Sequence, residues 1–247
     1  MPIDPLLAGA RRSWEELAGV PVPFPPCGGV NVAVSPESGM CPAGWVGVVA
    51  LGGSAIVTAP SDSAAAIVRD ALRELPVQAV VDADSVRAVL PVSRVLGPAV
   101  LAYLSPERFR PVPPVASEVE QLPAGNRELR LLEEVAGPED AGEAGLDEIT
   151  SPAFVVREGG QVVAAAGYRT WLGGTAHISV LTAPRARGRG LARAAGSATV
   201  AHALAAGLLP QWRARRTASR RVAAALGFAE LGAQLSIEMT GHSRPRP

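Results

Sequence analysis

The segment HISVLTAPRARGRGLARAAGS, residues 177–197, constrains the fold of this 247-residue chain more than any other. An apolar strand pattern runs into Pro184, then into a turn rich in glycine and arginine, and then into an alanine-rich helical pattern. The first N–H groups of a helix lack partners within the helix and carry partial positive charge, which favours a bound anion. Gly188 and Gly190 would let the backbone approach a phosphate without an intervening Cβ. The segment therefore predicts a pyrophosphate-binding turn between a strand and a helix.

The residues of the turn exclude other classes of phosphate site. The dinucleotide fingerprint GxGxxG fails, because Arg193 stands where the third glycine should be and the neighbouring strands look antiparallel. The chain contains no lysine, which excludes a Walker A loop and Schiff-base chemistry.

Charge is distributed unevenly along the chain. Lys+Arg and Asp+Glu both total 23, yet residues 181–247 hold 11 arginines and 2 acids, while residues 1–180 hold 12 arginines and 21 acids. Such asymmetry indicates a local anion site, for nucleic acid or for a phosphorylated small molecule. Nucleic-acid binding also needs stacking aromatics, and only Trp212 and Phe228 are available there, so we expect no nucleic-acid partner.

The second half of the chain predicts a regular order of helices and strands. We expect helices over 127–135 (capped by Asn126) and 138–149, an antiparallel meander of strands over 154–157, 161–168 and 177–182, a helix over 191–205, a strand over 208–215, a helix from Thr217 or Ser219 to Gly227, and one or two closing strands over 228–239.

The first half reads as mixed α/β and shows no catalytic constellation. We expect a helix over 5–18, strands over 31–34, 46–51, 54–58 and 100–104, and helices that begin at Asp62 and Asp84 as N-caps. The proline-rich stretch Phe109–Asn126 is typical of a linker. It predicts a domain over residues 1–115 and a second over 116–247.

Cysteines and the N-terminus limit the cellular context. Cys27 and Cys41 have no zinc or redox spacing, so we expect two ordinary thiols and no metal site. Asp4 precedes every basic residue, unlike in a secretory signal, and the longest apolar stretch, Trp45–Ala59, is too short to span a bilayer. We expect a cytoplasmic protein with no membrane partner.

The turn resembles the acyl-CoA-binding motif of the GNAT superfamily of N-acyltransferases, Q/R-x-x-G-x-G/A. The motif reads here as Arg187-Gly188-Arg189-Gly190-Leu191-Ala192. A second register, Arg185 to Gly190, also fits, but the spacing from Pro184 favours the first. The resemblance covers about residues 124–242, including the order of elements and the helix that ends in Leu226-Gly227-Phe228.

The resemblance implies a GNAT fold in the C-terminal domain, that is, an α+β fold with a mixed, mostly antiparallel sheet and flanking helices. A smaller α/β domain precedes it, and a degenerate copy of the same fold is one alternative for that domain. The motif strand would part from the next strand near Pro210, and the thioester of acetyl-CoA would lie between them. The implied cofactor-binding residues are Val180, Leu181 and Thr182 for the pantetheine arm, Arg187, Gly188, Arg189, Gly190, Leu191, Ala192 and Arg193 for the pyrophosphate, and Ser219, whose alternative role is an N-cap.

The implied reaction is direct transfer of an acetyl group from acetyl-CoA to a primary amine. His177 is the candidate catalytic base by residue type. The sequence departs from the family pattern in two places, because Ala176 stands near the usual strand glutamate and Ala223 replaces the usual tyrosine acid. Tyr168 or water would have to take the place of that acid.

The acceptor and the assembly stay open. It would be an amine on a small molecule or peptide, and the acidic first 180 residues favour a cationic one. The alternative function is a non-catalytic acyl-CoA-binding sensor, which the two missing groups favour. A homodimer is left open.

Overall fold

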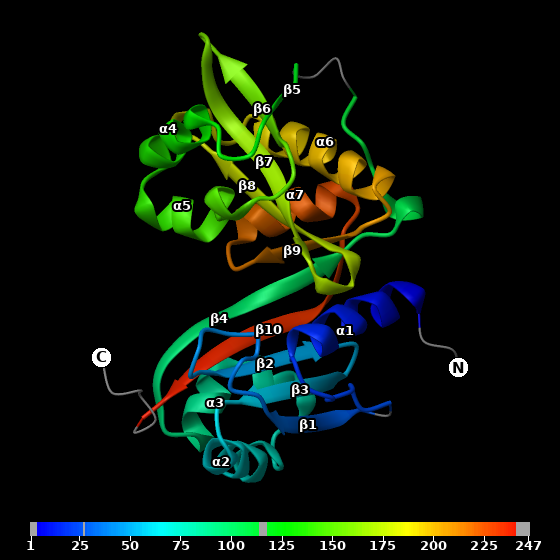
Figure 1. Cartoon of the computed structure of the whole chain (residues 1–247), viewed down its shortest axis with the longest axis vertical. Helices are drawn as coiled ribbons and strands as arrows, with labels where there is room; N and C mark the ends of the chain where they lie inside the picture. Colours follow the sequence, from blue (N-terminus) through cyan, green and yellow to red (C-terminus); the bar gives the residue numbers. More distant parts are fainter. Residues whose placement is uncertain (1–3, 27, 114–117, 241–247) are drawn as a thin grey trace. The chain divides into compact units, whose positions relative to one another are not determined.

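The computed structural model describes residues 4–26, 28–113 and 118–240 (Figure 1). The chain divides into two compact units, Met1–Leu101 with Glu230–Pro247, and Ala102–Ala229. The predicted boundary between residues 115 and 116, the side chain of Cys27 and the C-terminal residues from 241 lie outside the described residues. Within the described ranges, no helix has both the length and the apolarity needed to cross a bilayer.

The first unit is a mixed sheet with three helices. Its helices are α1 (Pro5–Leu17), α2 (Asp62–Leu72) and α3 (Ala83–Val89), and its strands are β1 (Gly29–Val34), β2 (Val46–Leu51), β3 (Ser54–Ala59), most of β4 (Val92–Tyr103) and most of β10 (Ala229–Met239). The strand order is β1-β3-β2-β10-β4. β1 runs parallel to β3, whereas β2 pairs antiparallel with both β3 and β10.

Continuous apolar sequence explains the core of this unit. Every residue of β2 and β3 is buried, as expected for strands covered on both faces. The expected helix starts need correction, because Ser61 and Asp82 are the N-caps in place of Asp62 and Asp84. The Ser61 hydroxyl accepts the Ala64 N–H, and the Asp82 carboxylate accepts the Ser85 N–H.

The second unit is a sheet of antiparallel strands with one parallel pair. Its elements are β5 (Glu120–Leu122), α4 (Arg127–Ala136), α5 (Pro138–Ala144), β6 (Ala153–Glu158), β7 (Gln161–Trp171), β8 (Thr175–Thr182), α6 (Leu191–Ala205), β9 (Leu209–Ala214) and α7 (Thr217–Leu226). The strand order is β9-β8-β7-β6-β5. The predicted meander, the Asn126 cap and the helix over 191–205 are confirmed.

Helices pack against both faces of this sheet. Neighbouring residues of β8 show the two faces, because Ile178 lies in one apolar cluster with Val200 of α6, whereas the Ser179 hydroxyl donates to the Gly145 carbonyl after α5. Leu129 and Leu132 of α4 are buried against the strands as well. The site strand β8 is therefore held between α4/α5 and α6/α7.

Three expectations differ from the structure. The helix predicted over 138–149 ends at Ala144, because Gly145 adopts a left-handed conformation (φ 60°) and a 3₁₀ turn follows. Part of the predicted linker is structured, since β5 pairs with β6 and the Arg110 N–H donates to the Leu226 carbonyl. The closing residues form one strand, β10, which pairs with β2.

Candidate active site

The two strands β8 and β9 separate partway along their length. Their parallel pairing covers Thr175–Leu209, Ala176–Pro210 and His177–Gln211. β8 then continues to Thr182 and β9 to Ala214, with no further register between them in the described ladder. Pro210 does not mark this separation as expected, because it lies within the paired part and its carbonyl accepts the Leu104 N–H at 3.2 Å. The unpaired edge of β8 runs from the residue after His177 towards the glycine turn.

The glycine turn at the end of this edge has the conformation that an anion site needs. Gly188 (φ 76°) and Gly190 (φ 80°) are both in the region that favours glycine, and a Cβ at either would meet no atom within 4 Å. Gly190 is the N-cap of α6 and has no side-chain cap. The first-turn amides of α6 therefore face open space, and the turn fits a pyrophosphate group.

Two buried polar atoms along the separated strands lack a hydrogen-bond partner. Within the described part of the chain, only three such side-chain atoms occur, Arg11 Nε, Thr182 Oγ1 and Gln211 Nε2. Thr182 ends β8 beside the turn, and Gln211 stands at the last β8–β9 pair. Since buried polar groups are normally paired, both atoms indicate a ligand between the strands.

The arginines around the turn are held by acidic residues. The pairs are Arg187 with Asp140 (2.5 Å), Arg189 with Glu158 (2.6 Å), Arg215 with Glu143, and Arg216 with Glu139 and Asp140 (both 2.6 Å). The Arg187 hydrogen bond lowers the pKa of the Asp140 carboxyl, and the charges of Arg187 and Arg216 lower it further. A phosphate that approaches these guanidinium groups must therefore compete with carboxylates. Arg193 is exposed on the first turn of α6.

His177 lies where the strands part. Its Nδ1 is 2.5 Å from Gln211 Oε1, and its ring stacks on Trp171 with centroids 4.4 Å apart. Burial lowers the pKa of His177 to about 3, with the positive charges of Arg213 and Arg169 acting in the same direction and the Gln211 hydrogen bond opposing them. The imidazole is neutral at pH 7. Because an amide oxygen only accepts, Nδ1 carries the proton and Nε2 is free to accept.

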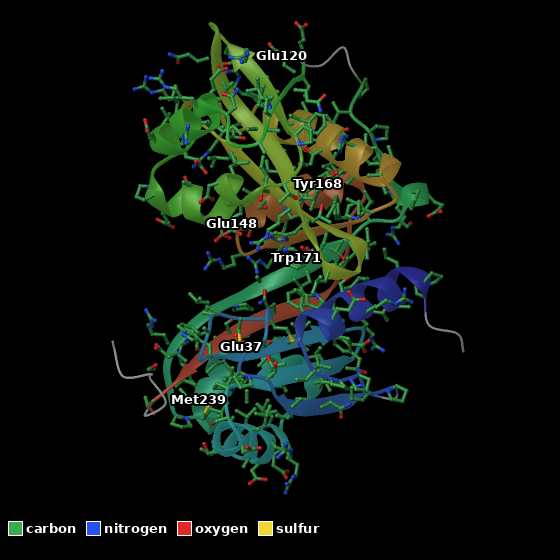
Figure 2. The ribbon with its side chains drawn as sticks, viewed as in Figure 1. Glu37, Glu120, Glu148, Tyr168, Trp171 and Met239 are labelled. Atoms are coloured by element: carbon green, nitrogen blue, oxygen red, sulfur yellow. The ribbon has the colours of Figure 1, made fainter. Side chains whose placement is uncertain are left out.

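Tyr168 and Ser219 have other contacts. The Tyr168 hydroxyl lies 3.0 Å from His202 Nδ1, and burial raises its pKa. Its partner in β8 is Ile178, the residue after His177, so Tyr168 and His177 lie on opposite faces of the sheet. Figure 2 labels Tyr168 and Trp171 on β7, and Glu148, which pairs with Arg169.

The Ser219 hydroxyl accepts from the Trp212 indole at 2.9 Å, and the N-cap of α7 is Arg216. Ser219 is therefore not the N-cap that the sequence allowed. Ala176 and Ala223 are both buried in the apolar cluster on the α6/α7 face. Nothing polar replaces the family's glutamate or tyrosine at those two positions.

The structure thus brings together His177, the end of β8 and the turn. Val180, Leu181 and Thr182 follow His177 on the unpaired edge, and Leu191 and Ala192 open α6. Sequence reasoning missed Gln211, although a lone glutamine inside the apolar strand pattern LLPQWRA was a signal. It also missed Trp171 and Asp140, which only the fold brings to the site.

Comparison with known proteins agrees with this geometry. The GNAT acetyltransferase family model matches residues 151–233. Among solved structures, a putative GNAT-family acetyltransferase from Novosphingobium aromaticivorans is 24% identical, with a TM-score of 0.48 over 59% of this chain and 65% of that chain. A GCN5-related N-acetyltransferase from Kribbella flavida is 20% identical, with a TM-score of 0.45 over 60% of each chain.

The matched part of this chain spans less than two thirds of the length of either protein. No curated protein sequence matches the chain. The resemblance drawn from the turn is nevertheless confirmed, because residues 151–233, from the end of the segment before β6 into β10, are a GNAT acetyltransferase region.

Proposed function

We propose that this protein transfers an acetyl group from acetyl-CoA to a primary amine by direct attack in a ternary complex. The observation that carries the proposal is the glycine turn, whose unpaired amides and open space lie at the end of the unpaired edge of β8. The family match over residues 151–233 supports the same reading.

Backbone groups do most of the binding in this proposal. The amides from Gly188 to Arg193 hold the pyrophosphate, and the unpaired edge at Val180, Leu181 and Thr182 holds the pantetheine arm as a neighbouring strand would. Arg187, Arg215 and Arg216 exchange their carboxylate partners for phosphate oxygens. Such exchanges cost little, because exposed ion pairs contribute only about 0–1 kcal/mol each.

Acetyl-CoA supplies a thioester carbonyl carbon that a neutral amine can attack. The amine nitrogen bonds to that carbon and loses a proton, while sulfur leaves with the C–S bonding pair and takes up a proton. His177 Nε2 accepts a hydrogen bond from the amine and orients it. An imidazole with a pKa of about 3 holds a proton poorly at pH 7, so the proton passes on to water.

The charge around His177 favours an amine that also carries an acidic group. Arg169 and Arg213 both act on the imidazole as positive charges, and Glu148 pairs with one of them. This local field differs from the acidic total of residues 1–180, from which the sequence predicted a cationic acceptor. We propose an amino-acid-like acceptor, because its carboxylate would interact favourably with these arginines.

A sensor that binds acyl-CoA without turnover is the second candidate. Ala176 and Ala223 leave the family's usual acid and base positions empty of polar groups, and His177 is a weak base. Release of free CoA in the presence of an amine separates the two functions, since a sensor binds acetyl-CoA and releases none.

Calorimetric titration of acetyl-CoA and CoA tests the site first. Gly190→Asn and Gly190→Asp form a matched pair, because both residues tolerate the left-handed conformation and differ only in charge. Two like charges about 4 Å apart repel by roughly 4 kcal/mol near a protein surface, so we expect Asp to bind CoA about 100-fold more weakly than Asn.

The outcome decides between binding and its absence. Wild-type binding that the Asp variant loses, with both variants folded by circular dichroism, supports the phosphate site and justifies an amine screen. A folded wild type that binds neither ligand would sink the proposal.

A further inference from the structure

The side-chain amide of Gln211 is only half satisfied. Gln211 is fully buried, with 0% of its surface exposed. Its Oε1 lies 2.5 Å from His177 Nδ1, whereas its Nε2 has no hydrogen-bond partner. A buried donor without an acceptor destabilises the folded state, and native proteins keep few of them. The free N–H₂ group therefore indicates an acceptor that comes from outside the chain.

This donor lies at the closed end of the separated strands. Gln211 stands opposite His177 in the last pair of the β8–β9 ladder. The glycine turn follows the other end of β8, and the strand from Thr182 back to His177 measures about 17 Å. A pantetheine arm that starts from a pyrophosphate on the turn and follows β8 ends near His177 with its thioester.

The contact with His177 fixes the direction in which the amide faces. Because the amide oxygen accepts from Nδ1–H, the nitrogen of the same planar group is held on the side away from the imidazole. Trp171 stacks on the imidazole and restrains its ring in turn. The free donor is therefore preorganised before any ligand arrives.

We propose that Gln211 Nε2 donates a hydrogen bond to the thioester carbonyl oxygen of bound acyl-CoA, an inference that rests on the proposed acetyltransferase function. This oxygen gains negative charge as the amine nitrogen bonds to the carbonyl carbon. A preorganised donor there stabilises the transition state more than the ground state. Gln211 is thereby a catalytic residue, and His177 is also its positioning partner.

The chain offers a matched set of variants for the test. Gln211→Glu keeps the shape and the oxygen that faces His177 but has no N–H₂ group, and Gln211→Met removes both polar atoms. Gln234→Met is the control, because Gln234 is also buried and donates to the Met40 carbonyl in the first unit. The probes are CoA, acetyl-CoA and S-ethyl-CoA, a thioether that lacks the carbonyl oxygen.

Binding is measured by calorimetry, and turnover by CoA release. We expect wild type and Gln234→Met to bind acetyl-CoA about three- to tenfold more tightly than S-ethyl-CoA, the value of one hydrogen bond. Both Gln211 variants should lose this preference while their affinity for CoA changes little. With an amine that is turned over, kcat should fall about 100-fold in Gln211→Met.

The outcomes separate this proposal from the proposed function. Folded Gln211 variants that keep the preference for acetyl-CoA over S-ethyl-CoA would overturn the role of Gln211 alone. A wild type that binds no CoA overturns the acetyltransferase function and this inference with it. If both Gln211 variants fail to fold, wild type decides, because equal affinity for acetyl-CoA and S-ethyl-CoA overturns the carbonyl contact and a clear preference supports it.

Discussion

The low pKa of His177 makes the stability of the protein depend on pH in a way that can be calculated. An unfolded histidine titrates near pH 6.5, whereas burial beside Gln211, Arg169 and Arg213 lowers the pKa of His177 to about 3 in the folded chain. Between these values the unfolded state binds a proton and the folded state does not. The contribution of His177 is therefore complete above about pH 6.5 and is lost progressively as the pH falls.

The size of the effect follows from the two pKa values. Each pH unit below 6.5 costs the folded state about 1.4 kcal/mol, so the change from pH 7 to pH 5 lowers the free energy of unfolding by about 2 kcal/mol through this residue. His177→Asn removes the titration and keeps an N–H donor facing Gln211 Oε1. Wild type should therefore lose about 2 kcal/mol more than His177→Asn over this range.

Urea unfolding of both proteins at pH 7 and pH 5 measures this difference. Other titrating groups contribute equally to both proteins and cancel in the comparison. An equal loss of stability in wild type and His177→Asn would refute the reasoning, as would an NMR titration in which the His177 ring protons shift near pH 6.5. Either result would mean that the imidazole is hydrated, and His177 would then regain the base strength that catalysis at pH 7 needs.

Three further predictions follow from the site and the core. Asp140→Asn should strengthen CoA binding about two- to fivefold in low salt by releasing Arg187 and Arg216, measured by calorimetry; weaker binding would mean that the carboxylate positions these guanidinium groups instead. Trp171→Leu should raise the pKa of His177 by letting water reach the ring, which NMR titration would show as a shift of the inflection to higher pH. Burial raises the pKa of the Cys41 thiol to about 11, so peptide mapping after alkylation at pH 8 should find Cys41 labelled only in urea.

Local sequence signals predicted the site strand, the turn and its helix well. The alternation in β7 and β8, the Gly159-Gly160 turn and the alanine-rich run of α6 each agree with the structure. Each of these features depends on residues close together in the chain. Gly188 and Gly190 are the clearest case, because their positive φ values follow from the turn itself.

Partners distant in the sequence could not be predicted in the same way. The pattern of residues 229–239 predicts a strand but does not say which strand it pairs with, and β10 pairs with β2, about 180 residues earlier in the chain. The end of α5 was missed for a related reason. The acidic residues after Pro138 continue a helical pattern, and only the left-handed Gly145 ends it.

The ion pairs change what the charge asymmetry means. Eleven arginines against two acids in residues 181–247 indicated a strongly positive anion site. In the fold, however, α5 and β6 bring acids from residues 121–180 onto the arginines of the turn, so the guanidinium groups are already paired. The amides of α6 and the turn, which no side chain caps, are the part of the site that does not have to exchange a partner. Affinity for the pyrophosphate should therefore come mainly from the backbone, which is why the character of the Gly188–Gly190 turn, and not the number of arginines, is the informative signal in this sequence.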